Sequence, residues 1–152
     1  MKHASAFALG MMFFTFFATA PALDAAAEES AAAGSEAGRT FTRVPAPFGI
    51  LIRRFNKTDG AQPKRTDRVS VHYHGTLKDG RVFDSSVERG RPAAFRMKRV
   101  IQCWSEALTL LHVGEKAEIV CPPETAYGVR GARPAIPPNA TLTFQIEILG
   151  IE

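Results

Sequence analysis

Residues 69–86 read VSVHYHGTLKDGRVFDSS, and this stretch decides the fold. From Val69 to His74, apolar residues alternate with polar ones, a period of two that predicts a strand with one buried face. The pair Asp79-Gly80 then predicts a hairpin turn, because glycine adopts positive φ at no steric cost. Val82-Phe83 begins the returning strand. The segment therefore predicts a β-hairpin whose apolar side chains face one side of a sheet.

Outside this hairpin, three further segments carry strand patterns and one carries a helical pattern. Apolar or alternating runs occupy residues 48–52, 117–121 and 142–148. Residues 101–111, IQCWSEALTLL, repeat apolar side chains at three- and four-residue spacing, which predicts a helix. Together these patterns predict an α+β domain of about five antiparallel strands, with one short helix packed across the apolar face of the sheet.

The N-terminus has the pattern of a secretory signal. A basic start is followed by uncharged residues 6–18, AFALGMMFFTFFA, and then by the small residues of 18–22. As a helix this apolar run would be only about 20 Å long, whereas a helix that crosses a bilayer core needs about twenty residues, or about 30 Å. We expect a signal peptide over residues 1–22, cleaved after Ala22, with a retained membrane anchor as the alternative. The mature protein is then expected in the periplasm or outside the cell, free of the membrane.

The residues after the signal divide into an arm and a domain. Residues 23–40, LDAAAEESAAAGSEAGRT, hold little that is large and apolar, so they predict a segment that buries too little to order itself. Strand patterns begin at Phe48. We therefore expect a flexible alanine-rich arm over residues 23–47 and a folded domain over residues 48–152.

Charge and motif content exclude several classes of protein. The chain has 19 Lys and Arg against 15 Asp and Glu, and the basic residues do not interleave with aromatic ones as in a nucleic-acid-binding surface. His72 and His74 point to the same face of their strand, which is conceivable for a metal site, but no Cys or carboxylate stands at a supporting spacing. We expect solvent-facing histidines and no metal or other cofactor. Ser85-Ser86 has no histidine in a fixed relation to it, so a serine nucleophile is not expected.

Aromatic residues and prolines cluster instead at the ends of the predicted elements. They occur just past the hairpin, at the start of the helix, around Tyr127, in the loop 136–141 and at Phe144. Each occurrence alone is typical of a core. Together they predict a shallow apolar pocket with a few polar groups at its edge.

Four motifs resemble an FKBP-type peptidyl-prolyl cis-trans isomerase. They are VHYHGTLKDGRVFDSS, V-I-x-x-W at residues 100–104, ETAYGVRG and IPPNATLTFQIEIL, and the resemblance covers residues 48–152. The signal pattern makes the chain similar to the exported bacterial members, including the macrophage-infectivity-potentiator type. The resemblance implies a curved antiparallel sheet wrapped around the short helix, and isomerisation of X–Pro bonds. Some members carry a helical dimerisation domain in front, but this chain has only the short arm, so we expect a monomer.

The resemblance also implies the roles of individual residues. Trp104 is expected as the floor under the prolyl ring, Tyr127 as a hydroxyl donor to a carbonyl, and Asp84 as a group beside the twisting bond, oriented by Tyr73 and Arg89. Ile136 is expected in a flexible loop over the pocket. The expected catalytic residues are Phe83, Asp84, Trp104 and Tyr127, and the expected substrate-binding residues are Tyr73, Arg89, Phe95, Val100, Ile101, Ile136 and Phe144.

Three departures from the family pattern are expected to change ligand preference. Ala93 stands where many members have a phenylalanine, the segment 97–100 is shorter by about two residues than in the best-known eukaryotic form, and the loop tip 131–135 has no histidine.

The implied partners are proline-containing unfolded polypeptides and macrolide inhibitors. The alternative is a binding module that holds unfolded exported chains through exposed loop residues such as Ile136, with incidental isomerisation.

The two cysteines of the chain leave two interpretations open. An oxidising compartment permits a disulfide between Cys103 and Cys121, and the strand pattern points Cys121 toward the helix that carries Cys103. Two buried free thiols are the other interpretation, because cysteine is often a small core residue.

Overall fold

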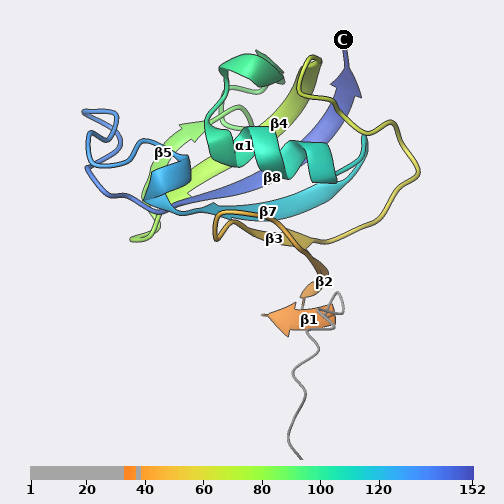
Figure 1. Cartoon of the computed structure of the whole chain (residues 1–152), viewed down its shortest axis with the longest axis horizontal. Coiled ribbons are helices and arrows are strands. Elements are labelled where there is room, and N and C mark those ends of the chain that lie inside the picture. Colours follow the sequence, from red (N-terminus) through yellow and green to blue (C-terminus); the bar gives the residue numbers. More distant parts are fainter. Residues whose placement is uncertain (1–32, 37–38) are drawn as a thin grey trace, which may run out of the picture.

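The computed structural model describes residues 33–36 and 39–152. A curved antiparallel sheet is crossed on its concave side by one short helix (Figure 1). The strands are β1 (Ala33–Glu36), β2 (Arg39–Val44), β3 (Leu51–Arg54), β4 (Arg68–Leu77), β5 (Val82–Ser85), β6 (Ala93–Arg96), β7 (Lys116–Cys121) and β8 (Leu142–Ile151). The helical segments are α1 (Gln102–Ala107) and the 3-10 turns η1 (Met97–Arg99), η2 (Leu108–Leu110) and η3 (Pro123–Thr125).

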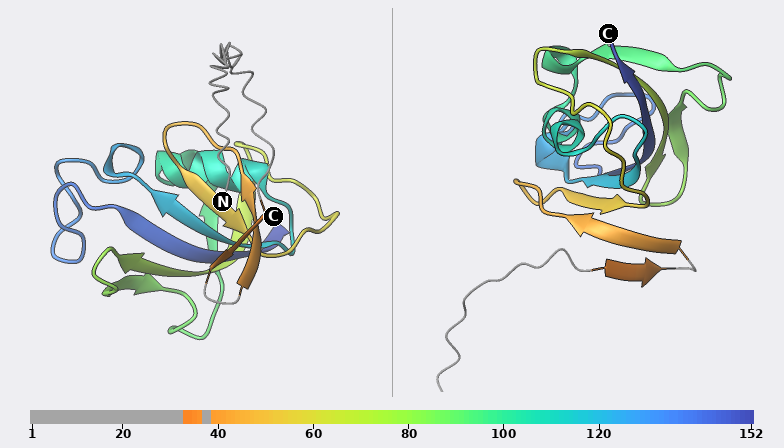
Figure 2. Two further views of the ribbon diagram at one scale, coloured as in Figure 1. Left: turned by 90° about the horizontal axis from the view of Figure 1, so that it is seen from below. Right: turned by 90° about the vertical axis from the view of Figure 1, so that its right-hand side faces the viewer.

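The order of the strands places the two longest ones side by side in the sheet. The order is β1-β2-β3-β7-β8-β4-β5, and β6 pairs with β4. β4 and β8 pair along nearly their whole length, with Tyr73 opposite Ile146 and Gly75 opposite Phe144. Alternate residues of β4 from Val69 onward are buried, so the period-two prediction for this strand is confirmed. On the side of β7 away from β8, the sheet continues through β3, β2 and β1 (Figure 2).

The core lies between the helix and the concave face of the sheet. The helical pattern predicted over residues 101–111 is divided between α1 and η2. Cys103, Leu108 and Leu111 are fully buried there against Ile119 and Ile148 of the sheet. The expected arrangement of helix on sheet is therefore confirmed. Among the described residues, no helix is long and apolar enough to cross a membrane.

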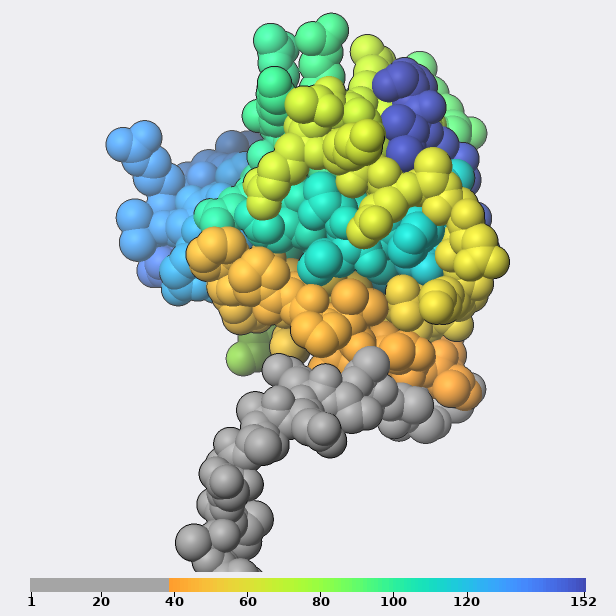
Figure 3. Space-filling view, turned by 45° about the vertical axis from the view of Figure 1, so that its right-hand side comes forward, coloured from red at the N-terminus to blue at the C-terminus, as the bar shows by residue number. Residues whose placement is uncertain are grey.

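The N-terminal boundary of the folded region differs from the sequence prediction. Residues 39–44, predicted as part of a flexible arm, form β2 and pair with β3. The cause is Phe41, which is only 8% exposed and lies under the guanidinium of Arg53, 5.5 Å from its ring centroid. β2 lies beneath the helix in the space-filling view, in orange below the teal surface (Figure 3). Residues 1–32 and 37–38, which hold the predicted signal and most of the arm, lie outside the described residues.

The strand count among the described residues is also larger than expected, at eight rather than about five. β1, β2 and β6 are short edge or flanking strands, with 4, 6 and 4 residues.

A disulfide joins α1 to the end of β7. The bridge links Cys103 to Cys121 with a Cα–Cα distance of 5.7 Å, and both residues are fully buried. Trp104 follows the first cysteine and Pro122 follows the second. The bridge therefore ties the helix that carries Trp104 to the strand that leads into η3.

Candidate active site

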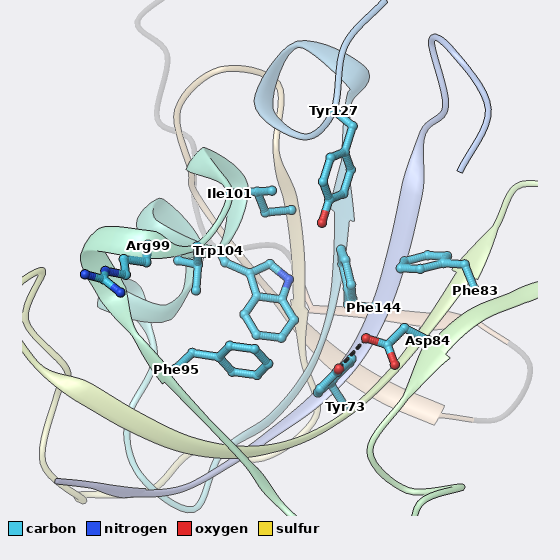
Figure 4. A pocket seen from close by; sticks show the side chains of 10 residues that line it. Tyr73, Phe83, Asp84, Phe95, Arg99, Ile101, Trp104, Tyr127 and Phe144 are labelled. Carbon is cyan, nitrogen blue, oxygen red and sulfur yellow. Dashed lines mark hydrogen bonds between the residues drawn. The ribbon is translucent and has the colours of Figure 1, made fainter. Parts of the chain in front are cut away.

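The largest cluster of aromatic side chains surrounds a pocket between α1 and the sheet. The pocket has a volume of about 330 Å³ and opens to solvent (Figure 4). Ten residues line it: Tyr73, Phe83, Asp84, Phe95, Arg99, Val100, Ile101, Trp104, Tyr127 and Phe144. Nine of them are residues predicted from the sequence, and they come from β4, β5, β6, α1, β8 and the connections between them.

Trp104 is the centre of the aromatic cluster. Its ring is 4% exposed and makes edge-to-face contacts with Tyr73, Phe95 and Phe144, at centroid distances of 5.2, 5.3 and 5.1 Å. Phe83 stands edge-to-face on Phe144 at 5.4 Å. Perpendicular neighbours hold the indole in one orientation. The indole face is therefore a fixed apolar floor.

Gly75 makes room for two of these rings, and the sequence reasoning missed it. A Cβ at this position would lie 2.6 Å from the Cζ atom of Phe83 and 3.1 Å from Phe144. Any side chain would therefore displace the Phe83 ring and crowd the Phe144 ring. A glycine inside a strand pattern is the signal that could have indicated such a close approach.

The polar side of the pocket is a hydrogen-bonded set of three residues. The Tyr73 hydroxyl donates to Asp84 Oδ2 at 2.5 Å, and Arg89 donates to the Tyr73 hydroxyl at 2.8 Å. Arg89 also forms an ion pair with Asp84. Figure 4 shows the carboxylate of Asp84 beside Tyr73 on the side of the pocket opposite Phe95. Arg89 does not line the pocket itself, so it acts through its two partners.

This arrangement fixes the protonation of both pocket residues. Partial burial alone would raise the pKa of the Asp84 carboxyl, but hydrogen bonds from Tyr73 and Arg89 outweigh it, and the pKa is lowered. Burial and the hydrogen bond to Asp84 raise the pKa of Tyr73. The hydrogen bonds to Asp84 and Tyr73 raise the pKa of Arg89 as well. At neutral pH the pocket therefore holds an ionised carboxylate and an intact phenol.

Tyr127 and Ile101 face each other across the upper part of the pocket. The ring of Tyr127 follows η3 and is 41% exposed, and its hydroxyl points into the pocket in Figure 4. The loop is held there because the Gly128 N–H donates to the Pro123 carbonyl at 2.8 Å. Ile101 caps α1, and its own N–H has no backbone partner among the described residues. Both residues thus offer a donor to a ligand.

Two residues differ from their expected placement. Ile136 is only 4% exposed and is not among the pocket residues, because its N–H and carbonyl pair with Ala132 and fold the loop over it. The expectation of an exposed loop residue at this position is wrong. Arg99, at the end of η1, does line the pocket and was not predicted. A basic residue directly before the V-I-x-x-W motif was the available signal.

His72 and His74 lie on the face of β4 opposite Tyr73. They are partly buried rather than free in solvent, since their Nδ1 atoms lie 3.2 Å from Ser86 Oγ and 3.0 Å from Ser85 Oγ. Among the described residues, no three His, Cys, Asp or Glu side chains come together as metal ligands would.

A curved antiparallel sheet, one short helix and an aromatic pocket with few polar groups between them form the architecture that the sequence resemblance implies. A family model described as FKBP-type peptidyl-prolyl cis-trans isomerase matches residues 60–149. The chain belongs to this family. The fold and family predicted from the sequence are confirmed.

Individual relatives agree with this assignment. The FKBP-type 22 kDa peptidyl-prolyl cis-trans isomerase of Escherichia coli is 56% identical over 103 residues, which cover 68% of this chain and 50% of that protein. FK506-binding protein 1A of Emericella nidulans is 51% identical over 109 residues, covering 68% of this chain and 99% of that protein. The crystal structure of FkpA from Escherichia coli superposes with a TM-score of 0.69 and 42% identity, over 72% of this chain and 51% of that one. This chain thus spans half of the bacterial relatives and nearly all of the fungal one.

Proposed function

We propose that the protein accelerates the cis–trans isomerisation of X–Pro bonds in unfolded or partly folded polypeptides. The observation that carries this proposal is the aromatic pocket floored by Trp104, with one ionised carboxylate and two unengaged donors at its edge. A prolyl ring fits such an apolar enclosure, and the donors suit the carbonyls on either side of it.

The chemistry requires no covalent bond to form or break. Rotation about the imide meets a barrier of about 18–20 kcal/mol, which comes from resonance in the planar bond. The planar form is the more polar one, and the twisted form has lost its charge separation. An apolar pocket therefore favours the twisted state relative to the planar state, which is the differential binding that lowers a barrier.

Nine of the ten lining residues have a role in this proposal. Phe83, Trp104 and Phe144 enclose the prolyl ring, and the Ile101 N–H and the Tyr127 hydroxyl donate to substrate carbonyls. Asp84, fixed by Tyr73 and Arg89, lies beside the twisting bond. Phe95 and Val100 complete the walls. The same pocket would take macrolides of the FK506 type, which compete with a prolyl peptide for the indole floor.

A rival proposal is a holdase in which isomerisation is incidental. Val129, which is 77% exposed, lies two residues from Tyr127 and offers an apolar contact for an unfolded chain. Buried Ile136 does not. The rivals differ in one measurement: a holdase would keep its suppression of aggregation in pocket variants that have lost isomerisation.

The proposal is tested by following isomerisation of a Leu-Pro peptide by exchange NMR, with and without FK506. We expect acceleration that the macrolide abolishes. Absence of acceleration by the folded protein would overturn the proposal.

We further propose that the chain acts outside the cytoplasm as a monomer, after removal of residues 1–22. The signal pattern of the sequence supports export and cleavage, and the monomer is an expectation from the family resemblance. Mass spectrometry of exported protein should give an N-terminus at Leu23, and intact Met1 in membrane-bound material would contradict it. Light scattering tests the monomer.

A further inference from the structure

A second hollow lies beside the prolyl pocket and has a different character. It has a volume of about 390 Å³ and is lined by two arginines and three prolines: Arg81, Arg133, Pro134, Pro137 and Pro138. One wall is the turn between β4 and β5, and the other is the loop that runs from η3 to β8. Its only charged lining residues are the two arginines.

Both walls of the hollow belong to segments that also contribute residues to the prolyl pocket. Arg81 directly precedes β5 and stands two residues before Phe83, so the two Cα atoms lie about 7 Å apart. On the other wall, Pro138 is followed by Asn139, whose N–H donates to the Gly128 carbonyl at 2.8 Å, directly after Tyr127. Phe83 and Tyr127 both line the prolyl pocket. The hollow therefore lies next to the segments that carry these two pocket residues.

The positive charge of the hollow is hardly neutralised by the protein. Arg133 is exposed and takes part in no ion pair of the described residues. Arg81 has one distant partner, Asp79 at 3.8 Å, and both of these side chains are more than 60% exposed. Such an exposed pair is easily exchanged for another carboxylate. The nearest pocket carboxylate, Asp84, is already bound by Arg89.

We propose that this hollow is a carboxylate subsite, which favours client chains carrying Asp or Glu two residues away from the isomerised proline. An extended chain advances about 3.3 Å per residue, so the second residue from a proline that packs against Phe83 lies about 7 Å from it, within reach of the long Arg81 side chain. Guanidinium groups bind carboxylates through paired hydrogen bonds. The prolines fix the backbone of the wall that carries Arg133, which lowers the ordering cost of binding. This inference rests on the proposed isomerase function and names its preferred substrate class.

The test compares peptides that differ only by glutamate or glutamine at the second residue before or after the proline. Exchange NMR measures catalysed isomerisation directly, without a helper protease whose own charge preference would enter the rate. The proteins are the wild type, Arg81→Gln, Arg133→Gln and the double variant. Arg43→Gln, an exposed change of equal charge on β2, is the matched control.

For wild type and Arg43→Gln, we expect glutamate at one of the two positions to raise kcat/KM about three- to tenfold over glutamine at low salt. The double variant should lose this ratio, and 0.5 M salt should reduce it in the wild type, because screening weakens exposed charges. All variants should act equally on the glutamine peptides. A wild-type ratio near one at both positions, or an unchanged ratio in the double variant, would overturn the subsite. Failure of the isomerase proposal is distinct, since the glutamine peptides would then show no catalysis by any protein.

Discussion

Replacing Trp104 by leucine tests whether the pocket floor carries catalysis. The indole is 4% exposed and makes three edge-to-face contacts, each of which contributes about 0.5–1.5 kcal/mol beyond its burial. Truncating a buried tryptophan to alanine costs about 3–5 kcal/mol, and leucine refills part of the space. We expect Trp104→Leu to lower the free energy of unfolding by about 2–3 kcal/mol and to leave the protein folded.

The effect on catalysis follows from the contact that the prolyl ring loses. If leucine removes about 60 Å² of apolar contact, the loss is about 1.5 kcal/mol at about 25 cal/mol per Å². That corresponds to about a tenfold fall in kcat/KM. The assay is peptide isomerisation at 10 °C, well below unfolding, with urea denaturation measured in parallel.

A matched control separates lost catalysis from lost stability. Leu111 is fully buried and does not line the pocket, so Leu111→Ala should destabilise the protein by a similar amount, about 2–5 kcal/mol, and keep its kcat/KM. The reasoning fails if Trp104→Leu keeps activity within twofold of the wild type. It also fails if Leu111→Ala loses as much activity as Trp104→Leu.

Further predictions concern the polar groups and the disulfide. Tyr127→Phe removes one hydrogen bond from a half-exposed ring, so kcat/KM should fall a few-fold, by about 1 kcal/mol, with unchanged thermal unfolding. Asp84→Leu should lower turnover more than stability; equal turnover to wild type, above all when combined with Tyr127→Phe, would contradict the mechanism. The catalysed rate should be nearly flat between about pH 6 and 8, because the lowered pKa of Asp84 and the raised pKa of Tyr73 both lie outside this range; a bell-shaped profile would count against it. Thiol titration of the denatured, unreduced protein should find no free Cys103 or Cys121, whereas two reactive thiols would exclude the bridge.

Those parts of the fold that have long periodic segments could be predicted from the sequence. β4 and β8 have 10 residues each, and the alternation along them, with five buried residues on β4 and four on β8, identifies the buried face. β2 could not be predicted because it follows an alanine-rich stretch and has only one buried aromatic side chain, Phe41. The Phe41 ring packs against Arg53, a residue on the next strand that a local pattern does not include. Strand edges are decided by tertiary contacts of this kind, which local patterns do not contain.

The candidate site divides in the same way. Aromatic residues at the ends of elements predicted a pocket, and the family resemblance supplied the roles of Asp84 and Tyr127. The burial of Ile136 could not be predicted, because it depends on a loop that pairs with itself through Ala132. The placement of Arg99 at the pocket depends likewise on how η1 turns into α1.

The position of Asp84 is determined by Tyr73 on the neighbouring strand β4, through both its side chain and its backbone. At the pocket, the Tyr73 hydroxyl donates to the carboxylate. Along the backbone, the N–H of Tyr73 donates to Ser86 Oγ at 2.8 Å, and the Ser86 N–H donates to the Tyr73 carbonyl at 2.9 Å. Ser86 is fully buried and follows Asp84 by two residues. Because the backbone pairing and the phenol hold the same short segment, the direction of the carboxylate does not depend on Arg89 alone. The carboxylate is therefore a charge held in a fixed position beside the pocket, and the lowered pKa of Asp84 and the raised pKa of Tyr73 keep both groups in one protonation state near neutral pH.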